Sequence, residues 1–259
     1  VGREVTGDYY RSDYGEKVSD EVVLSVKNVS VPGLIHDVSF DLHKGEILGF
    51  GGLSESGMHE IGKAIFGASY DRTGSVTLAD GTQINDIPTA IKHSIAYTSK
   101  DRDNESVVLN QSIGDNICLP SLDSLAGKSH LLSDKKLKEF ANKYAKQMSV
   151  KMVNVDQFVS DLSGGNKQKV VLARWIGKDS DIVVLDSPTR GIDIKVKQDI
   201  YQLMNQMRKN GKSIIMISEE LMELIGMCDR IIIMKDGKIS GELERDEAMD
   251  ENSLITMMV

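Results

Sequence analysis

Cysteine is scarce in this sequence, with only Cys118 and Cys228 among 259 residues. Two isolated cysteines cannot build a disulfide framework or a zinc site, so we expect both to be small core residues. Long apolar runs are also absent, since none approaches the roughly 20 residues that a helix needs to cross a bilayer. The N-terminus has no apolar stretch of the kind found in secretory signals. These absences predict a cytosolic protein.

An excess of positive charge is missing as well. The sequence has 31 lysines and arginines against 39 aspartates and glutamates, which gives a net charge of −8. Binding to a nucleic-acid duplex requires concentrated lysine and arginine, so we expect no nucleic-acid partner, although one nucleotide needs only a local site. What remains is ordinary for a globular protein, with 40% hydrophobic and 27% charged residues.

The chain divides into three parts by sequence pattern. Residues 1–20 mix charges, glycine and tyrosine without periodicity and are expected to form a linker or tail. The folded domain is expected at 21–245, followed by a C-terminal tail at 246–259. Because the first residue is Val1 rather than methionine, we expect a fragment of a longer protein.

Two continuous apolar runs, 181–186 and 213–218, indicate strands buried on both faces, as in a parallel sheet. A helix expected at 195–210 supplies the crossover that parallel strands require. The predicted fold is therefore α/β, with a parallel-sheet core, an N-terminal antiparallel β element and a helical insertion near 115–175. Other expected elements are strands at 22–26, 38–42, 46–50 and 93–98, helices at 58–66 and 133–150, and hairpins that turn at Asp80-Gly81 and Asp236-Gly237.

A glycine-rich loop joins the strand 46–50 to the helix 58–66. Gly52 and Gly57 have the spacing of a phosphate-binding Walker A loop, whose amides and helix start attract an anion. The lysine and the hydroxyl that should follow are replaced by Met58 and His59, and Glu55 adds a carboxylate that repels phosphate. Taken alone, the loop is equally well explained as a plain strand-to-helix turn.

A Ser-Gly-Gly turn, Ser163-Gly164-Gly165, precedes a helix and is the strongest motif. It offers a hydroxyl and unobstructed backbone amides to one phosphate group. The alternative is a serine that only caps the helix. An apolar strand that ends at Asp186 and a polar turn that closes on Asp193 follow in order. Asp186 can hold Mg²⁺ beside a nucleotide or simply cap the next helix, but the whole series favours a nucleotide site.

These motifs, in this order, resemble the ABC ATPase family over about residues 21–245. The resemblance implies a P-loop NTPase (RecA-like) fold in which two domains sandwich ATP and Mg²⁺. Each site combines the phosphate loop and strand aspartate of one domain with the Ser-Gly-Gly signature of the other. Three segments are similar to the second half of the tandem ATPases of bacterial monosaccharide importers, namely 166–169, 189–193 and 227–231.

Five positions depart from the family pattern. They are Met58 and His59 in the loop, Ser187 for the catalytic glutamate, Glu219 for the switch histidine and Lys100 for the glutamine that organises Mg²⁺ and water. Ser187 cannot act as a base toward water, so the resemblance implies no catalytic residue in this chain. The nucleotide-binding positions that it implies are Gly52, Gly57, Met58, His59, Lys100, Ser163, Gly164, Gly165 and Asp193, with Asp186 as the Mg²⁺ ligand.

Three smaller expectations follow from the same comparison. No aromatic residue stands near Val31 and Pro32, where the family stacks adenine. Lys100 either replaces part of the charge lost at Met58 or is a solvated loop lysine. Arg190 and Arg230 are expected to pair with nearby carboxylates as structural residues.

The resulting hypothesis is a degenerate ATP-binding half of a sugar importer that donates its signature to ATP held by a partner half. The implied partners are an N-terminal ATPase half of the same protein, membrane permease subunits that contact the helical insertion and, indirectly, an extracellular or periplasmic sugar-binding protein. The implied location is the cytoplasmic face of the membrane. Two alternatives are an anchoring module that binds no nucleotide and a soluble ABC protein of translation or DNA repair.

Overall fold

The computed structural model describes residues 10–11, 18–245 and 249–259, so most of the expected linker 1–20 lies outside them. Its larger sheet has six strands in the order β5-β6-β7-β3-β8-β9. The first five pair in parallel and β9 is antiparallel to β8. The strands are β3 (Ile47–Gly52), β5 (Ile95–Thr98), β6 (Ile182–Asp186), β7 (Ser213–Ile217), β8 (Arg230–Lys235) and β9 (Lys238–Glu244). The predicted parallel α/β core is confirmed.

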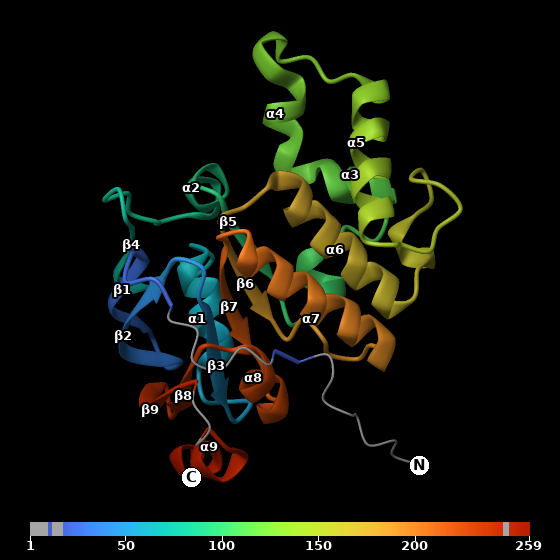
Figure 1. Ribbon diagram of the computed structural model, residues 1–259. Coiled ribbons are helices and arrows are strands. Elements are labelled where there is room, and N and C mark those ends of the chain that lie inside the picture. The colour runs from blue at the N-terminus through green and yellow to red at the C-terminus, as the bar shows by residue number, and fades with distance from the viewer. Residues whose placement is uncertain (1–9, 12–17, 246–248) are drawn as a thin grey trace.

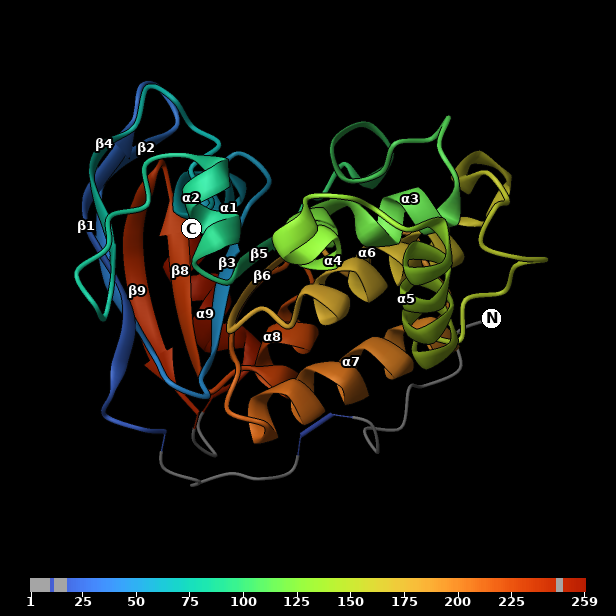
Figure 2. The ribbon, with the colours of Figure 1, turned by 90° about the horizontal axis from the view of Figure 1, so that it is seen from above.

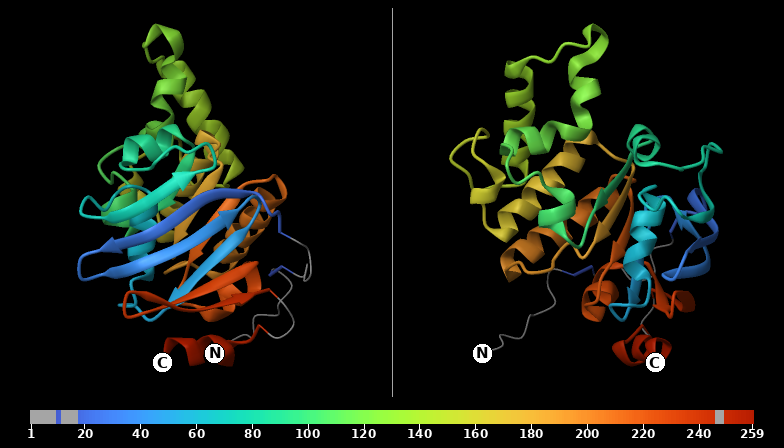
Figure 3. Two further views of the ribbon diagram at one scale, coloured as in Figure 1. Left: turned by 90° about the vertical axis from the view of Figure 1, so that its left-hand side faces the viewer. Right: turned by 180° about the vertical axis from the view of Figure 1, so that it is seen from behind.

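A second sheet has three antiparallel strands in the order β2-β1-β4. They are β1 (Val22–Val31), β2 (Ile35–His43) and β4 (Thr73–Leu78). Their alternating residues are buried, and Phe40 of β2 meets Phe50 of β3 with ring centroids 4.9 Å apart. This sheet is the expected N-terminal β element, and it lies beside the larger sheet (Figure 3).

The helices are α1 (Met58–Ile65), α2 (Ile87–Lys92), α3 (Ile113–Cys118), α4 (Leu122–Ala126), α5 (Asp134–Gln147), α6 (Gly164–Lys178), α7 (Ile194–Lys209), α8 (Leu221–Met227) and α9 (Glu251–Met258). Seen from above, the sheets lie on one side of the molecule and α5, α6 and α7 on the other (Figure 2). Helices α4 and α5 project as an arm (Figure 1), which places the expected helical insertion outside the sheet core. Within the described residues, no helix is both long and apolar enough to span a membrane.

The part of the expected C-terminal tail that the structure describes contains helix α9. Leu254 and Met258, four residues apart, share one face of this helix and are buried. Asp250 caps its start by accepting a hydrogen bond from the backbone amide of Ser253 at 2.8 Å. The segment is too short for its helical periodicity to stand out in the sequence, and it folds because it covers β8 and β9.

The carboxyl ends of the parallel strands meet at one edge of the larger sheet. The loops that leave β3, β5, β6 and β7 at this edge begin at Leu53, Ser99, Ser187 and Ser218. In open α/β sheets, ligands bind in the crevice beyond these ends. The fold thus brings four chain segments that are far apart in sequence to one place.

Candidate functional site

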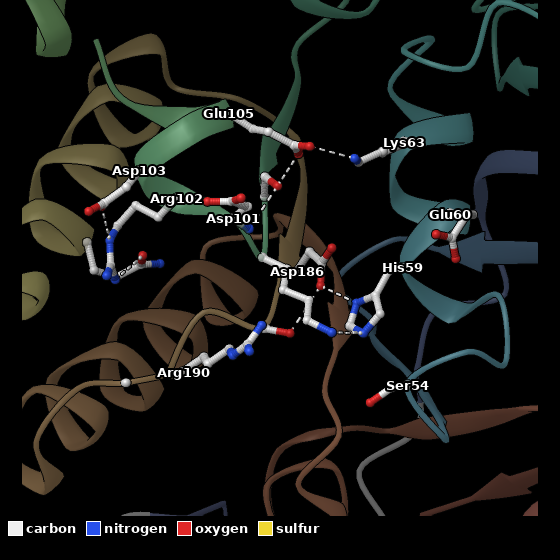
Figure 4. A pocket seen from close by; sticks show the side chains of 15 residues that line it. Ser54, His59, Glu60, Lys63, Asp101, Arg102, Asp103, Glu105, Asp186 and Arg190 are labelled. Atoms are coloured by element: carbon white, nitrogen blue, oxygen red, sulfur yellow. Dashed lines mark hydrogen bonds and ion pairs between the residues drawn. The ribbon is translucent and has the colours of Figure 1, made fainter. Parts of the chain in front are cut away.

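A cavity of about 690 Å³ opens at this edge of the sheet. Its walls come from the loop after β3 with the start of α1, the loop after β5, the loop after β6, and Gln168 of α6. The lining is polar and charged, with His59, Asp186 and Arg190 among its side chains (Figure 4). Lys100 also lines the cavity. The cavity therefore has the phosphate loop on one side and Gln168, which follows the Ser-Gly-Gly turn on α6, on another.

The phosphate loop has the tight backbone that its glycines predict. Gly57 precedes α1 with φ of 90°, and a Cβ atom there would lie 2.7 Å from the carbonyl oxygen of Leu34. A Cβ atom on Gly52 would lie 2.6 Å from the carbonyl oxygen of Met234. Because both contacts are too close for a real side chain, only glycine fits at either position. Glu55 is exposed at the tip of this loop.

Met58 stands at the position where a Walker A loop has a lysine, but its side chain does not line the cavity. Its side chain is 0% exposed and belongs to the hydrophobic core. An apolar side chain gains free energy by turning inward at this point, whereas a lysine would extend toward phosphate. The Met58 side chain therefore lies in the core, and a nucleotide contact at this position stays a prediction.

His59 fills the space beside the strand aspartate. Its Nδ1 atom lies 2.7 Å from Oδ1 of Asp186, and its Nε2 atom lies 3.3 Å from Oε1 of Glu219 and 3.0 Å from Nζ of Lys100. Lys100 in turn donates to Oε1 of Glu219 at 2.7 Å. Lys100 is thus paired with Glu219 in the cavity wall, with 25% of its side chain exposed. We call these four residues, Asp186, His59, Glu219 and Lys100, the closing network.

The closing network does not fit a Mg²⁺ ion at Asp186. Oδ1 of this carboxylate already contacts His59 and accepts a hydrogen bond from the Ser187 hydroxyl at 3.1 Å, while Oδ2 accepts one from Tyr97 at 3.5 Å. The part of the chain that the structure describes contains no group of three or more His, Cys, Asp or Glu side chains placed to hold a metal. Mg²⁺ favours oxygen ligands and several waters, whereas the nearest contact of Oδ1 of Asp186 is the imidazole nitrogen of His59.

The Lys100 ammonium holds the pKa of Glu219 well below its usual range, at about 2, with further hydrogen bonds from Ser54 and His59. A carboxylate with a depressed pKa contributes stability above its unfolded pKa, and this contribution is lost as the pH falls toward the folded value. We expect Lys100→Met to raise the pKa of Glu219 toward the ordinary glutamate value. An NMR titration of the Glu219 carboxyl carbon in both proteins measures the change, and an unchanged pKa would contradict the assigned cause.

The Ser163 side chain does not cap helix α6, although Ser163 occupies the capping position. Its hydroxyl oxygen accepts a hydrogen bond from the Asn166 side chain at 3.0 Å and makes no bond to the backbone amides of the helix. Ser163 is exposed, and Gly164 and Gly165 open the helix. The structure therefore disfavours the interpretation of Ser163 as a plain capping residue and leaves its hydroxyl free to donate.

Asp193 has a structural role at the start of α7. Its carboxylate accepts a hydrogen bond from the backbone amide of Val196 at 3.1 Å, as a capping residue does. A Cβ atom on Gly165 would lie 3.9 Å from Oδ2 of Asp193. Asp193 therefore lies beside the Ser-Gly-Gly turn rather than in the cavity with the phosphate loop.

Arg190 and Arg230, which were both expected to pair with carboxylates, differ in their ion pairs. Arg230 pairs with Glu46 at 2.8 Å and with Glu242 at 2.7 Å, as predicted. Arg190 is exposed and lines the cavity, and no ion pair with it occurs among the described residues.

Sequence reasoning missed Glu223, a carboxylate that is 1% exposed. It accepts hydrogen bonds from Thr189 at 2.7 Å and from Ser218 at 2.9 Å, and so ties the loop after β6 to the loop after β7. No motif marks this residue, because its partners come from distant segments. The buried network fixes the loops that carry Ser187 and Glu219.

Comparisons with known proteins agree with this geometry. The family model described as "ABC transporter" matches residues 35–190. The ribose import ATP-binding protein of Clostridium perfringens (strain 13 / Type A) is 41% identical over 97% of this chain, and the match covers 50% of that protein. The xylose import ATP-binding protein of Thermoanaerobacter pseudethanolicus is 42% identical over 97% of the chain and is covered to 51%. The chain thus spans about half the length of these relatives.

Solved structures share the fold at lower sequence identity. A dimeric post-hydrolysis state of an ATP-binding cassette bound to ADP and Pi superposes with a TM-score of 0.75, 21% identity and coverage of 86% of this chain and 99% of that one. A nucleotide-free ATP-binding cassette from an ABC transporter gives a TM-score of 0.76 at 19% identity, with coverage of 92% and 99%. With a family model that matches well over half of its residues, the chain belongs to the ABC transporter family.

Proposed function

We propose that this chain is the degenerate ATP-binding half of an ABC-type sugar importer and that it donates Ser163, Gly164 and Gly165 to ATP held by a partner half. The observation that carries the proposal is an asymmetry within one domain. Beside the phosphate loop, the strand aspartate contacts His59 and Lys100 pairs with Glu219, while Ser163 of the Ser-Gly-Gly turn is exposed and its two glycines are half-buried.

The closing network supports the loss of hydrolysis in this half. Hydrolysis needs a cation at the β- and γ-phosphates, a Mg²⁺ ion and a group that positions or activates water. Here Met58 is buried, His59 contacts Asp186, and Ser187 offers no base. Lys100 and Glu219 form an ion pair at 2.7 Å. The charge of Lys100 is therefore paired within the chain and is less available to a phosphate.

The exposed turn supports donation to a second site. A helix start with two glycines lets the backbone approach a phosphate closely, and its amides carry partial positive charge. Ser163 keeps a hydroxyl that can donate, since its oxygen only accepts from Asn166. This turn can therefore complete a nucleotide site whose phosphate loop belongs to another domain.

The identity of the partners follows from the relatives. Because the ribose and xylose import proteins are about twice as long as this chain, we infer an N-terminal ATPase half in the same protein. Their names indicate import of a monosaccharide, which implies permease subunits and a location at the cytoplasmic face of the membrane. The projecting α4–α5 arm is the part of this chain that we assign to the permease contact.

ATPase measurements on the isolated chain test the proposal. We expect turnover far below about 1 per second, the lower end of the ordinary enzyme range, because charge, base and metal site are all altered. We also expect weak ATP binding, measured by calorimetry, in contrast to tight ATP retention by the assembled protein. Ordinary turnover in the isolated chain would refute a degenerate half, and an assembled protein that retains no ATP would favour the anchoring module.

A further inference from the structure

Arg102 lies in the cavity wall, next to the Ser-Gly-Gly turn, with only weak hydrogen bonds to the described residues. Its Nε atom is 3.4 Å from Oδ1 of Asp103 and its Nη1 atom is 3.4 Å from Oε1 of Gln168. Both distances exceed the usual range for N–H···O hydrogen bonds, about 2.7 to 3.2 Å. The side chain is 18% exposed, so the guanidinium is held close to the protein without being neutralised well.

The guanidinium sits against the first glycine of the turn. A Cβ atom on Gly164 would lie 3.2 Å from Nη2 of Arg102 and 3.7 Å from the carbonyl oxygen of Gly191. Figure 4 shows Arg102 and Asp103 on the side of the cavity nearest α6, away from His59. Arg102 therefore lies against the Ser-Gly-Gly turn and does not belong to the closing network.

The short helical turn Arg102–Ser106 that carries this side chain is fixed to α6 at both ends. Lys167 pairs with Asp103 at 2.8 Å. The buried Arg174 donates to the carbonyl oxygen of Ser106 at 2.6 Å. Arg174 shows how a structural arginine is bonded in this chain, with short bonds to three acceptor atoms. Arg102 makes no such short bonds to the residues that the structure describes, although the turn that carries it is also anchored to α6.

We propose that Arg102 is a second phosphate-binding residue of the donated signature and contacts the γ-phosphate of ATP held by the partner half. The inference rests on the proposed function, because it needs ATP to face Ser163, Gly164 and Gly165. The serine hydroxyl and the amides are neutral donors, and Arg102 adds a full positive charge with a planar fork that suits phosphate oxygens. An anchored turn holds this fork in place before ATP arrives, so little ordering is needed on binding.

The test compares ATP with ADP in the full-length protein assembled with its permease, in a background where the partner half's catalytic glutamate is replaced by glutamine. We expect Arg102→Ala to weaken ATP binding about tenfold or more, as the loss of a charge-assisted hydrogen bond does. ADP affinity should not change, because ADP lacks the γ-phosphate. Arg102→Gln, which keeps a polar side chain without charge, should have the same ATP affinity as Arg102→Ala. The ATP affinity of Arg102→Lys should lie between those of these two variants and that of the parent protein.

Two further variants separate the possible outcomes. Lys209→Ala removes an exposed cation at the end of α7 and should leave both affinities unchanged. Ser163→Arg, measured in parallel, tests the proposed function itself. Loss of ATP binding in Ser163→Arg with parental ATP affinity in Arg102→Ala would overturn the role of Arg102 and leave signature donation intact. Parental ATP affinity of Ser163→Arg would overturn both, and an equal loss of ATP and ADP affinity in Arg102→Gln would assign Arg102 a structural role.

Discussion

Ser163→Arg in this half is expected to lower the ATPase activity of the assembled transporter by about two to three orders of magnitude, the loss found when one preorganised donor to a transition state is removed. The arginine side chain would fill the space that the γ-phosphate needs in front of Gly164 and Gly165. Because Ser163 is exposed and its hydroxyl caps no backbone amide, the isolated variant should remain folded. ATPase and sugar uptake in vesicles, with circular dichroism of the isolated chain, measure the two effects.

A bulky residue at Gly164 should have the same result for a related reason. A Cβ atom added at this position would lie 3.2 Å from Nη2 of Arg102, so a larger side chain must push the guanidinium aside and cover the turn. The control is Ser187→Ala, which removes a hydroxyl that donates to Asp186 at 3.1 Å and should have little effect on activity. Full activity with a disrupted turn, or complete loss with Ser187→Ala, would contradict the division of labour between the halves.

Much of the fold was predictable because it depends on local patterns. The buried strands β6 and β7 appear in the sequence as continuous apolar runs, and α7 between them shows helical periodicity. The turn at Asp236-Gly237 predicted the hairpin of β8 and β9, which pair as expected. Helix α9 was missed because only eight residues carry its pattern.

The candidate site was predictable in position but not in its contacts. The spacing of Gly52 and Gly57 predicted a tight loop, and the order of motifs placed it near Asp186. The pairing of His59 with Asp186 and of Lys100 with Glu219 joins residues that are 127 and 119 positions apart in the chain. Such contacts depend on how the loops are placed by the sheet, and a single sequence does not contain that information. The direction of the Met58 side chain was missed for the same reason.

Met58→Lys alone is expected to leave the isolated chain without ATPase activity. The lysine would restore the residue type that a phosphate loop uses, but it would start from a position that is 0% exposed. Its ammonium must either stay in the core, where an unpaired charge is strongly unfavourable, or reach a cavity in which Lys100 is already paired with Glu219. In neither case does the chain gain a base, because Ser187 is unchanged.

Thermal unfolding and steady-state ATPase of the isolated chain test both parts of this prediction. Met58→Lys should lower Tm, whereas Met58→Leu, which keeps an apolar side chain of similar volume, should change the free energy of unfolding by less than about 1.5 kcal/mol. Adding His59→Ser, Ser187→Glu and Glu219→His to Met58→Lys replaces two of the four residues of the closing network and should restore tight Mg²⁺-dependent ATP binding. Turnover of about 1 per second or more from Met58→Lys alone would show that another residue of this half acts as the base and that its catalytic machinery is not lost.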